Sequence, residues 1–161
     1  GAGSTVFARN VIGDCILTPE LGTFDVCLFD IDPVRLDESY QILSNINKTA
    51  NGKANIVKTL DRTEAFTGAD FVVISILPGT FDEMESDVHA PEAYGIYQSV
   101  GDTVGAGGFM RAMRTIPMYV TIAEAIRDYS PNAWVINYTN PMTLCVRTLY
   151  HVFPKIGRAH V

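Results

Sequence analysis

The sequence has few cysteines, no long apolar run and no block of like charges, and each absence excludes a class of protein. Cys15, Cys27 and Cys145 are too few and too widely spaced for a disulfide framework or a CxxC metal site, so we interpret them as small core residues in a reducing cytoplasm. No apolar run approaches the roughly 18–20 residues of a membrane span. Without a run of about five like charges, we expect neither nucleic acid nor a membrane surface as a partner.

What is present fits a globular α/β protein. The chain has 161 residues, of which 47% are hydrophobic, and a formal net charge of −6, which suits one domain and excludes intrinsic disorder. Short apolar runs alternate with helical patterns, which predicts a Rossmann-like, doubly wound parallel sheet. Strands are expected at 24–31, 54–59, 70–76 and 133–137, and helices at 5–17, 33–47, 62–66, partly at 82–94, at 109–129 with an interruption at Pro117, and at 141–153.

The first residues have the glycine spacing of a dinucleotide-binding loop. Gly1 and Gly3 would supply the tight turn and the close approach of a pyrophosphate, and Ser4 and Thr5 would begin the following helix. Val6 replaces the third glycine of the fingerprint, and we expect the strand that normally precedes the loop to be missing from this chain. A glycine pair before a helix is more often a structural turn, and the spacing alone leaves that alternative open.

Carboxylates close the first expected strand. Asp30 is our first choice for accepting hydrogen bonds from the adenosine ribose, and Asp32 is the second, although Asp32 precedes a proline and is also well placed to cap the next helix. Leu77 and Pro78 follow the third expected strand and should lie beside the same cofactor, because ligands of open parallel sheets bind at the carboxyl ends of strands. An acid at the ribose position favours NAD over NADP.

Later segments carry a more specific signal. They read ILPGTFDEME at 76–85, YGIYQSVGDT at 94–103, GAGG at 105–108 and INYTNPM at 136–142. From Gly1 to about Lys155 the sequence resembles the NAD- and metal-dependent glycosidases of glycoside hydrolase family 4, most of all the α-galacturonidases and next the α-galactosidases and α-glucosidases. The resemblance implies that residues 1–155 are the NAD-binding domain of a longer protein whose C-terminal catalytic domain is missing, so the piece alone should be inactive.

The resemblance also implies a reaction that differs from hydrolysis by two carboxylates. In the family, hydride leaves C3 of the sugar for NAD, a tyrosine takes the C2 proton, the aglycone leaves C1 by elimination, water adds, and the hydride returns. A divalent metal, usually manganese, holds the C2 and C3 oxygens. The expected protein is a cytoplasmic hydrolase of small α-galacturonides or α-galactosides that forms homodimers or homotetramers at full length.

Some residues match motif positions of the family. Asp102, in Gly-Asp-Thr, matches the acid that makes the catalytic tyrosine more basic, because a nearby negative charge disfavours phenolate. Asn140, in Asn-Pro-Met, matches the substrate-binding asparagine, whose amide both donates to and accepts from hydroxyls. Asn137 is expected to reach the cofactor or the sugar. From spacing alone, the alternatives are a turn aspartate at 102 and an Asx turn at 140.

Other polar residues keep open interpretations. Arg111 and Arg114 could pair with a uronate carboxylate, or could be helix-surface residues or subunit contacts. His89 is not assigned as a metal ligand. The metal-binding cysteine of the family would fall near position 161, where no cysteine stands, and its metal-binding histidine and catalytic tyrosine lie farther on, so we expect no metal ligand within this chain.

The end of the chain departs from the family pattern. Residues 156–161 resemble the in-frame translation of a sequencing adapter, so we expect a non-native tail in which His160 has no functional role. Two other functions remain as hypotheses. An NAD-dependent 2-hydroxy-acid dehydrogenase of the lactate and malate type shares the fold and an Asn-Pro after the fifth strand, and predicts net NADH production without a metal. A noncatalytic NAD-sensing or assembly module is the other.

Overall fold

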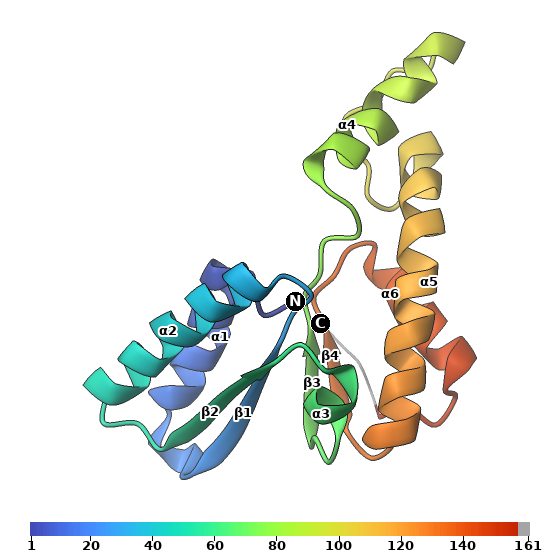
Figure 1. Cartoon of the computed structure of the whole chain (residues 1–161). Helices are drawn as coiled ribbons and strands as arrows, with labels where there is room; N and C mark the ends of the chain where they lie inside the picture. The colour runs from blue at the N-terminus through green and yellow to red at the C-terminus, as the bar shows by residue number, and fades with distance from the viewer. Residues whose placement is uncertain (158–161) are drawn as a thin grey trace. The chain divides into compact units, whose positions relative to one another are not determined.

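The computed structural model describes residues 1–157, which form two compact units, one spanning Gly1–Thr67 and the other beginning at Gly68. Each unit contains a pair of parallel strands with helices packed beside it (Figure 1). The expected α/β class with parallel strands is therefore confirmed. None of the helices within residues 1–157 combines the length and apolar character that a bilayer crossing requires.

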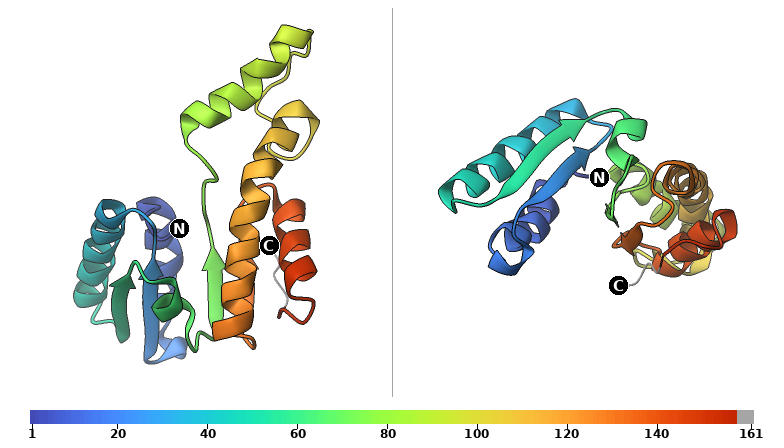
Figure 2. Two further views of the ribbon diagram at one scale, coloured as in Figure 1. Left: turned by 45° about the vertical axis from the view of Figure 1, so that its right-hand side comes forward. Right: turned by 90° about the horizontal axis from the view of Figure 1, so that it is seen from below.

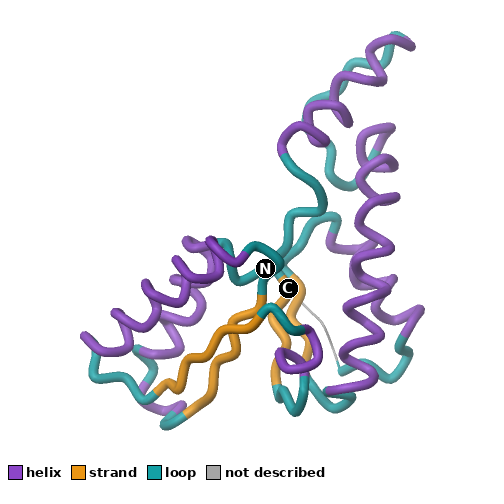
Figure 3. Tube along the Cα trace, in the orientation of Figure 1, coloured by secondary structure: helices purple, strands orange, loops and turns teal. Residues whose placement is uncertain are grey.

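The first unit is built around one buried cluster between two helices and two strands. Its elements are α1 (Thr5–Ile16), η1 (Pro19–Leu21), β1 (Phe24–Phe29), α2 (Pro33–Thr49), β2 (Ala54–Thr59) and α3 (Arg62–Phe66). Strands β1 and β2 are parallel neighbours, with Phe24 opposite Ala54. Figure 3 shows the two strands side by side and α1 and α2 lying together. The core consists of Ala8 from α1, Leu28 from β1, and Leu36 and Leu43 from α2. These apolar contacts hold both helices against one face of the strand pair.

The second unit is organised around a long helix. Its elements are β3 (Phe71–Ile74), α4 (Phe81–His89), η2 (Ala90–Tyr94), α5 (Gly105–Tyr129), β4 (Trp134–Asn137) and α6 (Met142–Val152). The strands are parallel, with Phe71 opposite Trp134 and Ile74 opposite Asn137. Helices α5 and α6 lie next to each other (Figure 2). The side chains of Tyr119 and Ile126 on α5 and of Leu149 on α6 are completely buried.

Helix α5 differs from the sequence prediction at two points. It begins at Gly105 rather than near 109, because its glycines permit close packing: a Cβ on Gly107 would lie 2.9 Å from the Asp87 carbonyl oxygen. It also continues through Pro117 without interruption. A proline in a helix interior costs about 3 kcal/mol. The complete burial of Thr115 and Tyr119 on either side of the proline shows that tertiary packing outweighs this cost.

The predicted tail begins within the described structure. Ile156 is 5% exposed, and Gly157 forms an isolated parallel bridge with Trp134 of β4. The other residues of that prediction, 158–161, lie outside the described residues. The boundary at 155 therefore stays a prediction.

The cysteines are not all core residues, which corrects our interpretation. Only Cys145 is buried, whereas Cys15 is intermediate and Cys27 is exposed. Successive residues of a strand face opposite sides, so burial of Leu28 against the helices turns Cys27 to the other face of β1.

This difference predicts selective alkylation. Burial raises the pKa of the Cys145 thiol to about 11, so at mildly alkaline pH little thiolate forms there and access is blocked as well. Burial and the neighbouring Glu64 also raise the pKa of Cys27, but that side chain is exposed. In brief iodoacetamide treatment followed by peptide mass mapping, Cys27 should be modified well before Cys145. Equal rates in the folded chain would contradict this placement.

Candidate functional site

The amino-terminal loop of the first unit lies against a carboxylate that follows β1. The Gly3 amide donates to Asp30 Oδ2 at 2.7 Å. A side chain at Gly3 would place its Cβ 2.9 Å from both Asp30 Oδ2 and Arg35 Cβ, closer than real Cβ contacts allow. Gly3 is therefore required for this approach of the loop to the carboxylate, consistent with the close contact that a dinucleotide-binding glycine provides.

The start of α1 next to this loop has the features of an anion-binding helix end. Ser4 is the N-cap residue, and its side chain makes no capping hydrogen bond. Thr5 follows as the first helical residue, and no acidic residue lies in the first turn. Because the first amides of a helix carry partial positive charge, this end favours a phosphate group.

The two carboxylates after β1 have different partners. Asp32 caps α2, because its Oδ1 accepts from the amides of Val34 at 2.9 Å and Arg35 at 3.2 Å. Asp30 Oδ1 accepts from the Asp32 amide at 3.0 Å, and its Oδ2 is bound to Gly3. An ionised carboxylate has about four acceptor positions, so Asp30 retains two. Asp32 also accepts two bonds, so the count of free positions does not separate the two carboxylates. Because Asp32 is engaged in capping α2, Asp30 stays our first prediction for the ribose hydroxyls.

In the second unit, a hydrogen-bond network joins the carboxyl ends of β3 and β4. The Ile76 amide donates to Thr139 Oγ1 at 2.9 Å. Asn137 Oδ1 accepts from the Tyr119 hydroxyl at 2.5 Å and from the Thr139 amide at 3.2 Å, while its Nδ2 donates to the Thr139 carbonyl at 3.1 Å. Burial raises the pKa of the Tyr119 hydroxyl, which therefore stays protonated and donates.

The predicted residues near these strand ends differ in exposure. Asn137 is 1% exposed, and its amide is used by Tyr119 and Thr139, so a contact with the cofactor or the sugar stays a prediction that the geometry does not favour. Asn140 is exposed and precedes a cis peptide bond to a buried proline. After β3, Leu77 is 45% exposed, whereas Pro78 is fully buried. Asn140 and Leu77 are thus the accessible members of the set.

Both arginines of α5 that we singled out pair with carboxylates of this chain. Arg111 Nη1 lies 2.9 Å from Asp102 Oδ1, and the Arg111 side chain is 7% exposed. Arg114 binds Asp87 in a bidentate manner, with Nη1 donating to Oδ1 at 2.9 Å and Nη2 to Oδ2. Arg111 is therefore not a helix-surface residue. A direct contact of either arginine with a uronate stays a prediction. The carboxylate partners that both guanidinium groups already have do not favour it.

No metal site is found within residues 1–157, where no three His, Cys, Asp or Glu side chains come together to hold an ion. His89 is exposed, and its Nδ1 lies 2.9 Å from Glu92 Oε1, one helical turn away. That contact is a surface pair.

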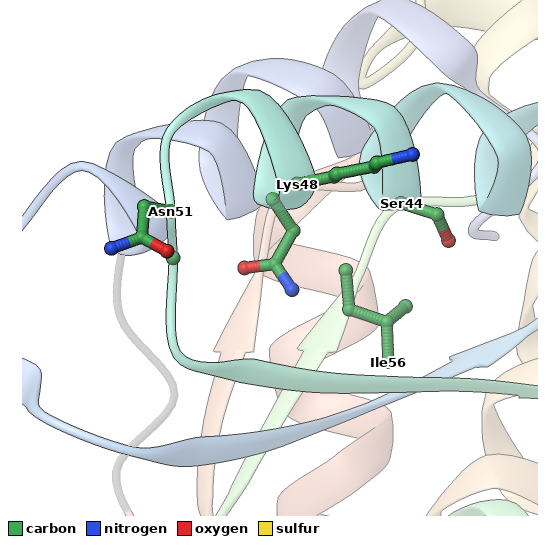
Figure 4. A pocket seen from close by; sticks show the side chains of 6 residues that line it. Ser44, Lys48, Asn51 and Ile56 are labelled. Atoms are coloured by element: carbon green, nitrogen blue, oxygen red, sulfur yellow. The ribbon is translucent and has the colours of Figure 1, made fainter.

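A pocket in the first unit lies away from the predicted site. It has a volume of about 320 Å³ and lies at the end of α2, with Ser44, Lys48, Asn51 and Ile56 among the residues that line it (Figure 4). This is the end of the first unit where β2 begins, opposite the carboxyl end that carries Asp30. Because parallel sheets bind ligands at the carboxyl ends of strands, we favour the Asp30 end as the cofactor site.

Comparison with known proteins decides the family. Residues 1–160 match the family model described as family 4 glycosyl hydrolase. The chain belongs to this family. An α-galacturonidase from Lachnoclostridium phytofermentans is 56% identical over 97% of this chain and 34% of its own length, and an α-galactosidase from Bacillus subtilis is 41% identical over 99% and 38%. The chain spans about a third of the length of the curated relatives it matches.

Solved structures agree with this assignment. A putative glucosidase from Bacillus subtilis superposes with a TM-score of 0.81 at 46% identity, covering 98% of this chain and 35% of that one. A 6-phospho-α-glucosidase from gut microorganisms, solved with NAD and Mn²⁺, gives 0.82 at 28% identity, covering 96% and 34%. A lactate dehydrogenase from Eimeria maxima gives 0.62 at 22% identity over 96% and 38%, a likeness of fold alone. The Rossmann-like fold expected for the family 4 chain is confirmed.

Sequence reasoning missed Tyr119 and Thr139 and did not pair Arg111 with Asp102. A signal was present: Arg111, Thr115 and Tyr119 recur every four residues, which places three polar side chains on one face of the helix. Periodicity places the three on one face, but it does not name their partners on other segments.

Proposed function

We propose that the whole enzyme to which this chain contributes hydrolyses α-galacturonides by reversible oxidation at C3 of the sugar, with NAD and manganese as cofactors. The observation that supports this substrate is the 56% identity with an α-galacturonidase over nearly the whole chain. Identity with an α-galactosidase is 41%, so α-galactosides are the second candidate substrate. A cytoplasmic location and a homodimer or homotetramer at full length stay predictions.

The first unit supports an NAD site. Gly1 and Gly3 form the loop, Ser4 and Thr5 begin a helix end suited to the pyrophosphate, and Asp30 keeps two acceptor positions for ribose hydroxyls. Bound NAD supplies a reversible hydride acceptor for C3. A relative solved with NAD and Mn²⁺ at a TM-score of 0.82 agrees with this cofactor pair.

The second unit would contribute groups that act on the sugar. Asn140, with an exposed amide, would bind sugar hydroxyls, and the Asp102 carboxylate would make the catalytic tyrosine more basic. Leu77, which is exposed after β3, would lie along the cofactor, whereas the fully buried Pro78 offers it no accessible surface. The family resemblance predicts that the metal ligands and the catalytic tyrosine lie farther along the whole enzyme. Among residues 1–157, no three His, Cys, Asp or Glu side chains come together to hold an ion.

The proposal predicts that the whole enzyme releases galacturonate from an aryl α-galacturonide only when NAD and manganese are both present, without net NADH formation. Desalting and chelation should remove the activity, and adding both cofactors back should restore it, as followed by the absorbance of the released aglycone. Hydrolysis that persists without either cofactor would rule out the mechanism. Net NADH formation from a 2-hydroxy acid, without a metal, would support the dehydrogenase hypothesis instead.

A further inference from the structure

Helix α5 carries a stripe of buried polar side chains that the proposed reaction does not use directly. Arg111 is 6% exposed, and Thr115 and Tyr119 are 0% exposed. Buried polar groups persist in proteins when they have partners. Thr115 bonds only within the helix, since its Oγ1 donates to the Arg111 carbonyl at 2.8 Å, whereas the residues on either side of it reach other segments.

Arg111 fixes the segment that carries Asp102. Besides the ion pair at 2.9 Å, the backbone of this segment packs closely on the start of α5: a Cβ on Gly108 would lie 2.9 Å from the Thr103 carbonyl carbon. The Asp102 side chain is 31% exposed, while that of Arg111 is 7% exposed. The Asp102 carboxylate is thus partly exposed, whereas the Arg111 guanidinium that pairs with it is buried within the second unit.

Tyr119 fixes the segment that leads to Asn140. Its hydroxyl donates to Asn137, whose amide bonds to both the amide and the carbonyl of Thr139. Thr139 Oγ1 in turn accepts from the amide of Ile76, after β3. Asn140 follows Thr139 directly and is exposed. The hydrogen bonds of Thr139 therefore hold the backbone next to Asn140, while the Asn140 side chain stays accessible.

We propose that Arg111 and Tyr119 are positioning residues, which hold the Asp102 carboxylate and the Asn140 amide at a set separation on one rigid helix. The two anchors are about 12 Å apart along the axis at the rise of an α-helix. This inference rests on the proposed function, which gives Asp102 and Asn140 their roles. Its consequence is that α5 orients the sugar, bound by Asn140, relative to the Asp102 carboxylate that makes the catalytic tyrosine more basic. A displacement of a reacting group by about 1 Å can lower the rate roughly 100-fold.

The first test is Tyr119→Phe in the whole enzyme, which removes the hydroxyl and keeps the ring. We expect kcat/KM for the aryl α-galacturonide to fall about 10-fold, because Asn140 is no longer held in place, while the Kd for NAD changes less than about 2-fold. In an Asn140→Ala background, Tyr119→Phe should lower kcat/KM less than about 2-fold, because the amide that Tyr119 is proposed to position is already absent. Tyr129→Phe, at the exposed end of the same helix, is the matched control.

The second test addresses the other anchor. Arg111→Met should lower kcat about 10-fold, and Arg111→Lys should recover part of that loss. In an Asp102→Ala background, neither substitution should lower kcat further. Arg127→Lys, in an exposed pair with Asp128, is the control. An equal loss in the presence and absence of Asn140 or Asp102, or no loss at all, overturns the inference while leaving the proposed function intact. An unsubstituted enzyme that is inactive on galacturonides and galactosides with both cofactors defeats the proposed function and this inference with it.

Discussion

Gly3→Val should weaken NAD binding about 100-fold, which is the largest effect on NAD affinity that we expect from any single change in the first unit. The Gly3 amide bonds to Asp30 at 2.7 Å, and even a bare Cβ would lie 2.9 Å from that carboxylate oxygen and from Arg35 Cβ. A branched side chain must therefore push the loop away from the acid, and the pyrophosphate and ribose contacts would be lost together. Isothermal titration of the whole enzyme with NAD measures the change.

The control for this prediction lies in the same unit. A Cβ on Gly13, within α1, would meet no atom within 4 Å, so Gly13→Ala should leave NAD affinity unchanged. It should raise the free energy of unfolding by about 0.5–1 kcal/mol, because alanine loses less backbone entropy in a helix than glycine does. Circular dichroism of the Gly3→Val protein distinguishes a local effect from unfolding. Retention of NAD affinity within about 2-fold by a folded Gly3→Val protein would contradict the proposed binding loop.

Elements with local signals were predicted well from the sequence. Strand β2 (Ala54–Thr59) and helix α3 (Arg62–Phe66) have the expected boundaries. Helix α2 begins at Pro33 as expected, because Asp32 caps it and proline suits a first helical position. The same capping rule predicts from the sequence that Asp32 caps the helix and that Asp30 is the first choice for the ribose. In these places the residues that decide the structure are neighbours in the sequence.

The differences arise where distant segments decide. Pro117 suggested an interruption of α5, but packing of the residues on either side of it keeps the helix continuous. Arg111 was open to several interpretations, and the structure pairs it with Asp102. Tyr119 was not singled out, because its partner Asn137 lies on a strand that follows the helix. Periodicity predicts which face of an element is buried, but a partner on another element depends on the tertiary fold.

The largest effect on catalysis is expected at Asp102. In the whole enzyme, Asp102→Ala should lower kcat about 100-fold, within the range of general-base effects, and should leave the affinity for NAD intact. The physical reason is that a carboxylate near the catalytic tyrosine disfavours phenolate and so makes the phenolate a stronger base. Arg111, at 2.9 Å, offsets much of this charge at long range, so the carboxylate can act only on a group in close contact with it.

The measurement compares aryl α-galacturonides with hydrogen and with deuterium at C2. Asp102→Ala should enlarge the isotope effect on kcat, because removal of the C2 proton then limits the rate more strongly than in the unsubstituted enzyme. Asp128→Ala, which removes an exposed carboxylate paired with Arg127 on α5, should change neither kcat nor the isotope effect. If Asp102→Ala weakened NAD binding as much as it slowed catalysis, the carboxylate would hold the fold of its loop and would not tune a base.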